Sequence, residues 1–183
     1  MHDLGRNEDR LRGTYEFPFE FHHIDSSHPR YVMSYHWHVE CEIMRVLQGT
    51  LTVTLDEKSF TAKAGDVIFV NSGVLHSGIP QDCIYQCIVF DMNMFLKFNS
   101  VCTEYMQKIS HQELLIYHHF TEKHPDIQRS VNSLFDSFWQ RKPGYELVVF
   151  GQFYHFFGLV FGNHYYLESL RKTRRDYKRI VQL

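Results

Sequence analysis

The stretch that decides the fold is His36-Trp37-His38-Val39-Glu40-Cys41-Glu42, in which two histidines and a glutamate are separated by two and four residues. Side chains two residues apart on a β-strand point to the same side of the sheet. We therefore expect His36, His38 and Glu42 to share one face of a strand. Such a face indicates a polar site within a β-structure.

A second segment begins at Gly65-Asp66-Val67-Ile68-Phe69-Val70 and leads to a third histidine, His76. Three imidazoles and one carboxylate are a ligand set for a divalent transition metal such as Zn, Ni, Mn or Fe, with positions left open for water or a ligand. The alternative is a hydrogen-bonded polar pocket without a metal. A lone histidine would favour that alternative, whereas four groups at this spacing do not.

The sequence on both sides of these segments is rich in short strands. Aromatic residues alternate with polar ones in the run that holds Phe17, Phe19 and Phe21. Further β-rich runs follow at residues 30–38, 40–47, 50–55, 59–62, 66–70 and 84–91, with turn candidates between them that include Gln48-Gly49. Many short strands at regular spacing predict an antiparallel sandwich or barrel.

After Asp91 the apolar spacing becomes helical. A helix is predicted from Asp126 to Arg141, before Pro143-Gly144, and a second one, aromatic nearly all round, from Tyr145 to Asn163. A shorter helix is predicted over Thr103 to Ile109. The sequence therefore predicts a mainly β domain followed by an α-hairpin.

The two histidine-bearing segments resemble the two motifs of the cupin superfamily. The resemblance implies a double-stranded β-helix, or jelly-roll barrel. All four metal-ligand positions of the family pattern are occupied, by His36, His38, Glu42 and His76. The sequence departs from the pattern at Arg30, Asn71 and Pro80, which weakens the case for a metal-dependent enzyme and leaves the fold unaffected.

A narrower resemblance covers nearly the whole chain. The runs His28-Pro29-Arg30-Tyr31, Tyr35-His36-Trp37-His38 and Leu75-His76-Ser77-Gly78 are similar to the N-terminal sensor half of AraC-type transcriptional regulators. The resemblance implies a barrel that binds a small effector, often a sugar or related metabolite, and helices that form a homodimer. It also implies two helix-turn-helix units beyond the sensor. The sequence has no segment like that DNA-binding half, so we expect a shortened chain or, less often, a natural sensor-only protein.

These patterns divide the chain into four parts. We expect a flexible N-terminus at 1–13, a cupin barrel at 14–100, a helical dimerisation region at 101–170 and, at 171–183, a basic linker toward a DNA-binding domain. The predicted function is effector sensing and dimerisation, without catalysis, and with DNA bound only through the further domain. A metal-dependent cupin enzyme, such as a dioxygenase or isomerase, is the main alternative, and a small-molecule binding protein without a DNA-binding partner domain is a third.

Several residues beyond the four ligand positions are candidates for function. Tyr31 and Arg45 could hydrogen-bond a polyol effector, although Arg45 has the opposite parity to Glu42 and could instead face solvent. The second helix carries aromatic side chains on more faces than one barrel can cover, which predicts a dimer interface at Phe150, Phe153, Phe157, Gly158 and Phe161. The competing interpretation is that the first helix and the barrel cover those faces within one chain.

Composition and charge exclude several other classes of protein. A content of 16% aromatic residues excludes a disordered chain, and four cysteines without CxxC spacing argue against a disulfide scaffold. The N-terminus does not resemble a signal peptide, and the most apolar stretch falls short of a bilayer span, so we expect a soluble cytoplasmic protein that does not enter membranes. Six of the basic residues lie in the last thirteen positions, while the formal net charge of the chain is -2. The acidic body is therefore expected to repel nucleic acid.

Overall fold

Two fifteen-residue strands, β4 (Cys41–Leu55) and β7 (His76–Phe90), form the centre of the fold and pair with each other in antiparallel orientation. The computed structural model describes residues 6–8, 10–97 and 101–169, so the predicted basic linker at 171–183 lies outside the described residues. The sequence predicts a turn at Gln48-Gly49, but β4 continues through it. Gly49 has a φ of +66°, and the register with β7 shifts there, so a bulge bends the strand without ending it.

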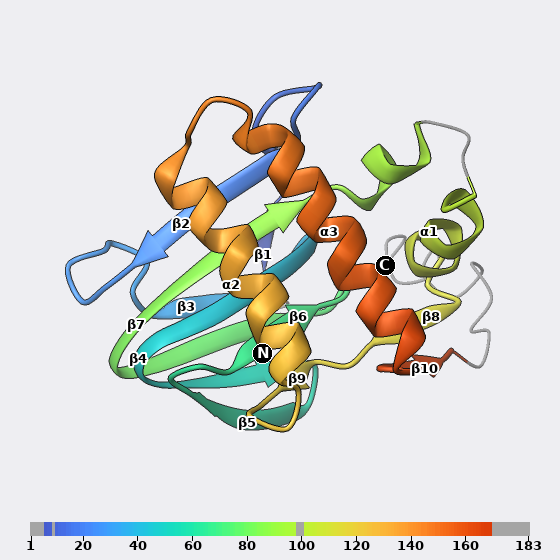
Figure 1. Ribbon diagram of the computed structural model, residues 1–183. Coiled ribbons are helices and arrows are strands. Elements are labelled where there is room, and N and C mark those ends of the chain that lie inside the picture. Colours follow the sequence, from blue (N-terminus) through green and yellow to red (C-terminus); the bar gives the residue numbers. More distant parts are fainter. Residues whose placement is uncertain (1–5, 9, 98–100, 170–183) are drawn as a thin grey trace.

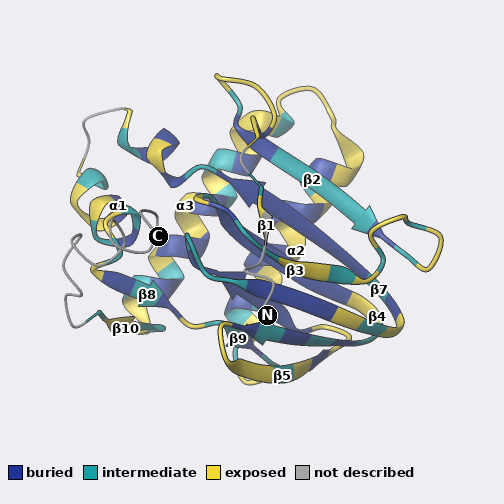
Figure 2. Ribbon diagram, turned by 180° about the vertical axis from the view of Figure 1, so that it is seen from behind, coloured by how far each residue is buried: buried dark blue, intermediate teal, exposed yellow. Residues whose placement is uncertain are grey.

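The other strands complete an eight-stranded sheet that curls into a barrel (Figure 1). Its remaining members are β1 (Arg6–Asn7), β2 (Phe19–Ile24), β3 (Met33–Trp37), β5 (Lys58–Lys63), β6 (Val67–Val70) and β9 (His119–Phe120). Figure 2 shows buried residues along β4 and β7 and mostly exposed ones on β5. The fold is the predicted cupin-type β-barrel with a C-terminal α-hairpin.

The helices match their predicted positions closely. Helix α2 (Pro125–Gln140) and helix α3 (Tyr145–Gly162) lie side by side over one face of the sheet (Figure 1). Residues 92–96 form the 3-10 helix η1 (Met92–Leu96), and α1 (Thr103–Ser110) follows. Among the helices of the described residues, none is both long and apolar enough to cross a bilayer.

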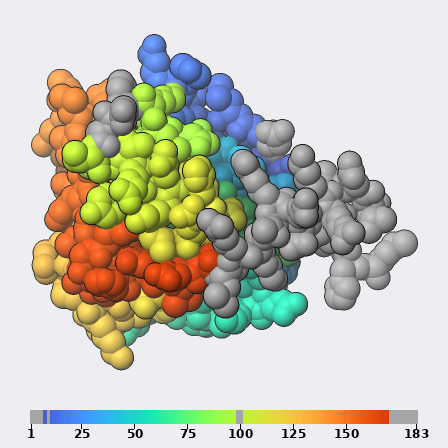
Figure 3. Space-filling view, turned by 90° about the vertical axis from the view of Figure 1, so that its right-hand side faces the viewer, coloured from blue at the N-terminus to red at the C-terminus, as the bar shows by residue number. Residues whose placement is uncertain are grey.

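A small second sheet closes the end of the helical layer. Its two strands are β8 (Leu114–Ile116) and β10 (Tyr166–Glu168), which pair in antiparallel orientation. Neither strand was expected from the sequence, because three residues are too few to show a period. In the space-filling view η1, α1 and β8 lie directly against the end of α3 and β10 (Figure 3), where the ring centroids of Tyr105 and Phe161 are 4.9 Å apart.

The central strands separate two hydrophobic cores because their side chains alternate. On β7, Tyr85 and Cys87 belong to the cluster inside the barrel. Their neighbours Ile88 and Phe90 belong to the cluster between the sheet and the helices. The barrel interior and the helical layer thus share the same strands, and each residue's parity decides which of them it enters.

The position of α3 corrects part of the predicted dimer interface. Phe153 and Phe157 are fully buried within their own chain, where both pack against Phe95. Phe150 and Phe161 are partly buried against the same core. The competing interpretation therefore holds for Phe153 and Phe157, whose rings lie in the core between α3 and the sheet. Gly158 is exposed, and a Cβ there would meet no described atom within 4 Å.

Candidate metal centre and its pocket

Four predicted side chains meet inside the barrel, and one potential ligand atom from each lies within 4.8 Å of the others. They are His36, His38, Glu42 and His76. Three of them are buried, and only His36 is partly exposed. The structure therefore brings together the whole set that the two motifs predicted.

The four side chains converge from three different strands. They do not share one face of a single strand, as the sequence predicted for three of them. His36 lies on β3, His38 directly follows that strand, Glu42 lies near the start of β4 and His76 begins β7. The chain bends at Val39 and Glu40, so the parity argument does not extend from His38 to Glu42. Curling of the sheet, with β3 and β4 both paired to β7, brings the groups together.

Each imidazole is held by a backbone carbonyl two residues away. The Nδ1 atoms of His36, His38 and His76 lie 2.9, 3.1 and 2.8 Å from the carbonyl oxygens of Ser34, Glu40 and Val74. A carbonyl oxygen only accepts, so Nδ1 donates its proton and Nε2 keeps a free lone pair. This is the orientation that a histidine needs to bind a metal through Nε2.

The free nitrogen atoms face a carboxylate. The Nε2 atoms of His38 and His76 lie 3.4 and 3.3 Å from Oε2 of Glu42. Both are buried without a hydrogen-bond partner among the described residues. Two lone pairs directed at a carboxylate need positive charge between them, which a divalent cation or a proton supplies. The residues present therefore fit a metal ion.

The pKa shifts of Glu42 and His76 also indicate that the cluster favours positive charge next to the carboxylate. Burial by itself would raise the pKa of Glu42, but the neighbouring imidazoles of His38 and His76 hold it well below its ordinary value. Burial would lower the pKa of His76, yet the carboxylate of Glu42 outweighs burial and raises it. The carboxylate of Glu42 therefore favours a proton on His76, and a metal ion would compete with that proton.

A cavity of about 540 Å³ adjoins the cluster. Its walls include His36, His38 and Glu42, together with apolar side chains from β2 and β7, namely Ile24, Tyr85 and Val89. This volume is in the usual range of small-molecule sites, which combine apolar walls with a few polar groups. The cavity can therefore hold a small ligand beside the four candidate metal ligands.

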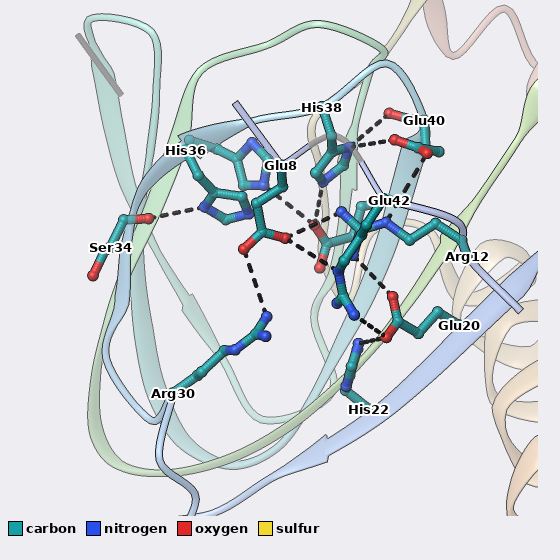
Figure 4. Close-up of polar contacts among 12 residues, drawn as sticks. Glu8, Arg12, Glu20, His22, Arg30, Ser34, His36, His38, Glu40 and Glu42 are labelled. Atoms are coloured by element: carbon teal, nitrogen blue, oxygen red, sulfur yellow. Dashed lines mark hydrogen bonds and ion pairs between the residues drawn. The ribbon is translucent and has the colours of Figure 1, made fainter. Parts of the chain in front are cut away.

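A charged network at the cavity was not predicted. Arg12 is 3% exposed and donates from Nη1 to Glu20 at 2.8 Å and from Nη2 to Glu8 at 3.1 Å (Figure 4). The predicted flexibility of residues 1–13 does not hold for their described part, because Arg6–Asn7 pairs with β3 and Arg12 is buried. The physical reason is the spacing of Glu8 and Arg12, four residues apart, with Glu20 opposite. This mixed pattern of acidic and basic residues was the sequence feature from which the network could have been predicted.

Tyr31 and Arg45, the two predicted polyol-binding residues, are not among the side chains that line the cavity. The hydroxyl of Tyr31 accepts a hydrogen bond from the backbone N–H of Cys83 at 3.0 Å. Arg45 lies on the other face of β4, where Nε donates to Gln86 and Nη2 to Asp136, both at 2.8 Å. Arg45 does not face solvent either, because α2 covers that face of β4.

Comparison with known proteins places these features in a family. The model of the AraC-like ligand binding domain matches residues 18–157. An uncharacterized HTH-type transcriptional regulator, YdeC of Bacillus subtilis (strain 168), is 34% identical over 56 residues, which is 29% of this chain. The match spans 19% of that regulator's length.

Solved structures with a local likeness are also found. An oxalate decarboxylase of Bacillus subtilis with Mn(II) centres is 25% identical over 33% of this chain and 18% of its own, with a TM-score of 0.30. The SPY1581 protein of unknown function from Streptococcus pyogenes is 15% identical over 40% of this chain and 62% of its own, with a TM-score of 0.34.

Proposed function

The chain belongs to the AraC-like ligand binding domain family, and from that membership we propose that its barrel senses a small-molecule effector for a DNA-binding transcriptional regulator. The observation that carries the proposal is the cavity of about 540 Å³ beside the cluster of His36, His38, Glu42 and His76. DNA would be bound by another part of the full regulator, which as a transcription factor would act in the cytoplasm.

The four clustered residues would hold a divalent transition metal, either Zn, Ni, Mn or Fe. Such an ion would offer open coordination positions to an oxygen atom of the effector. The protein's own contribution is to hold the imidazoles in the Nδ1-protonated form through the three backbone carbonyls. The apolar wall with Ile24 and Val89 would exclude water from the bound effector.

We further propose that the protein is a homodimer through the outer face of α3. With the phenylalanine rings turned inward, the face left for a partner contains Leu147, which is 80% exposed, and the exposed Gly151 and Gly158. Glycine at these positions would let a second helix approach closely, and a two-fold axis would let one patch serve both protomers. Such a dimer would set the separation of two DNA-binding parts.

A metal-dependent cupin enzyme is the second candidate, favoured by a ligand set that leaves coordination positions open. One experiment separates the two functions. Metal-loaded protein is incubated with a panel of sugars and organic acids, and both its melting temperature and the chemical identity of each compound are followed. The sensor predicts that at least one compound raises the melting temperature and is recovered unchanged.

The His76→Ala variant should lose that response, whereas His111→Ala, which changes an exposed histidine, should keep it. Conversion of a compound in proportion to time and protein concentration would contradict the sensor and favour the enzyme. A panel that leaves the melting temperature unchanged throughout would contradict both functions.

A further inference from the structure

The carboxylate of Glu8 occupies a site beside the cavity that is built from arginines. One oxygen of Glu8 accepts from Nη2 of Arg12 at 3.1 Å, and the other lies 3.6 Å from Nη1 of Arg30 (Figure 4). Arg10 approaches the same carboxylate at 3.9 Å. Each of these four side chains lines the cavity. The chain therefore places its own carboxylate where a ligand's anionic group would have three guanidinium partners.

Arg12 does not depend on Glu8 alone for its position. Arg12 is held by Glu20, with Nη1 at 2.8 Å, and by Glu40, whose Oε1 lies 4.0 Å from Nε. Its Nε atom is buried and has no hydrogen-bond partner among the described residues. A guanidinium that is 3% exposed and anchored in this way is preorganised to bind a carboxylate.

With a divalent ion bound in the cluster, the balance of charge favours an anion. Around the cavity three arginines stand against four glutamates, namely Arg10, Arg12 and Arg30 against Glu8, Glu20, Glu40 and Glu42. A divalent ion in the cluster would leave one net positive charge, and moving Glu8 into solvent would leave two. A neutral polyol would gain nothing from this charge, whereas an organic acid would compensate it.

We propose that the cavity binds a small organic acid, and that a carboxylate of this acid takes the place that Glu8 holds between Arg12 and Arg30. The inference rests on the proposed function, because it assumes that the cavity is the effector site, and it names an acid where the family resemblance suggests a sugar. Glu8 is then an internal competitor of the effector, and Arg30, whose side chain is 60% exposed, is the arginine that is free to close on the ligand.

The test is calorimetric titration of the metal-loaded protein with acetate, succinate and citrate, compared with erythritol and inorganic phosphate. At least one carboxylate should bind about tenfold or more tightly than erythritol, as expected for hydrogen bonds to charged groups. Arg30→Gln should lower the affinity for that acid by about tenfold and leave the affinity for erythritol unchanged. Glu8→Gln should raise the affinity for the acid about threefold or more, because it removes the charge that competes with the acid.

Glu57→Gln is the matched control, because Glu57 is exposed in the turn between β4 and β5 and does not line the cavity. It should bind each probe as the unaltered protein does, and thermal unfolding should show that Arg30→Gln and Glu8→Gln are folded. Binding of erythritol without binding of any acid would overturn this inference and leave the effector pocket standing. Phosphate that binds more tightly than every acid, or an acid whose affinity is unchanged in Arg30→Gln, would also overturn it. If none of these compounds binds, both the organic-acid site and the effector pocket are contradicted.

Discussion

His36 of β3 and His76 of β7 are register partners, and the centroids of their rings lie 4.1 Å apart. Forty positions separate them in the sequence, so the pairing of β3 with β7 assembles the two halves of the candidate metal centre. A slip of one residue in this register would turn His36 to the other face of the sheet. The register shift between Met33 and His36 is therefore part of how the site is built.

The first prediction concerns metal binding. Adding Mn, Fe, Ni or Zn to metal-free protein should raise the melting temperature by roughly 5–10 °C at a hundredfold excess over the dissociation constant. Glu42→Gln should abolish most of this rise, because it removes the only carboxylate of the four-residue cluster. Occupancy, measured by elemental analysis, should fall below about pH 6, where the imidazoles take up protons.

The control is His111→Ala, which removes an exposed histidine outside the cluster. It should retain the full response to metal. An equal response from Glu42→Gln and from the unaltered protein would show that the metal binds elsewhere.

The second prediction concerns the buried guanidinium of Arg12. Burial would raise the pKa of Glu20, but Arg12 and its other charged neighbours lower it from the ordinary value of 4.5. A lowered pKa in the folded state means that Glu20 stabilises the fold above about pH 4.5 and loses this effect as the pH falls through the folded value. Glu20→Gln should therefore lower the free energy of unfolding by about 1–3 kcal/mol at pH 7, and the difference should shrink in acid.

Urea unfolding at a series of pH values measures this difference. The control Glu16→Gln, at an exposed position, should stay within about 0.5 kcal/mol of the unaltered protein. A cost for Glu20→Gln that is the same at pH 7 and at pH 3 would contradict the ionic explanation.

The third prediction separates the two roles considered for Arg45. Arg45→Met should lower the free energy of unfolding by about 2–4 kcal/mol, because it removes the bonds to Gln86 and Asp136 and leaves buried Gln86 short of a partner. Ligand affinity should not change, since Arg45 faces α2 and not the cavity. Arg129→Met, on the exposed side of α2, is the control and should be nearly neutral. A variant with normal stability and lost affinity would restore Arg45 as a ligand-binding residue.

The fourth prediction addresses the dimer. A side chain at Gly158 meets no described atom within 4 Å in one chain, so Gly158→Leu should preserve the fold and favour the helix by up to about 1 kcal/mol. If a second α3 packs there, the same change should weaken the dimer about tenfold or more through steric clash. Sedimentation equilibrium measures the dimer, and circular dichroism the fold.

Leu147→Glu is a second, independent change on the same face and should also weaken the dimer by placing a charge in the apolar contact. Charge insertion at Phe157 is not a valid test, because it would disrupt the core of each chain. A monomer at micromolar concentration, or a dimer unaffected by both variants, would remove α3 from the interface.

Much of the fold could be predicted because its signals are local. The period of the apolar residues and the turn at Pro143-Gly144 predicted α2 and α3 to within one residue at each end. The strands were harder to delimit. The predicted turn at Gln48-Gly49 is a bulge in a continuous strand, because the pairing of β4 with β7 over its whole length outweighs the local turn preference.

The sequence by itself determined which residue types could form the site, since His36, His38, Glu42 and His76 were identifiable from motif spacing. Parity also placed Arg45 opposite Glu42. What covers each face was decided only by the tertiary structure: α2 covers Arg45, and Glu20 pairs with the buried Arg12. Periodicity reports the direction of a side chain relative to its own backbone, whereas burial and charge pairing depend on segments that are distant in the sequence. For that reason the arginine site around Glu8 and the inward turn of Phe153 became visible only in the folded chain.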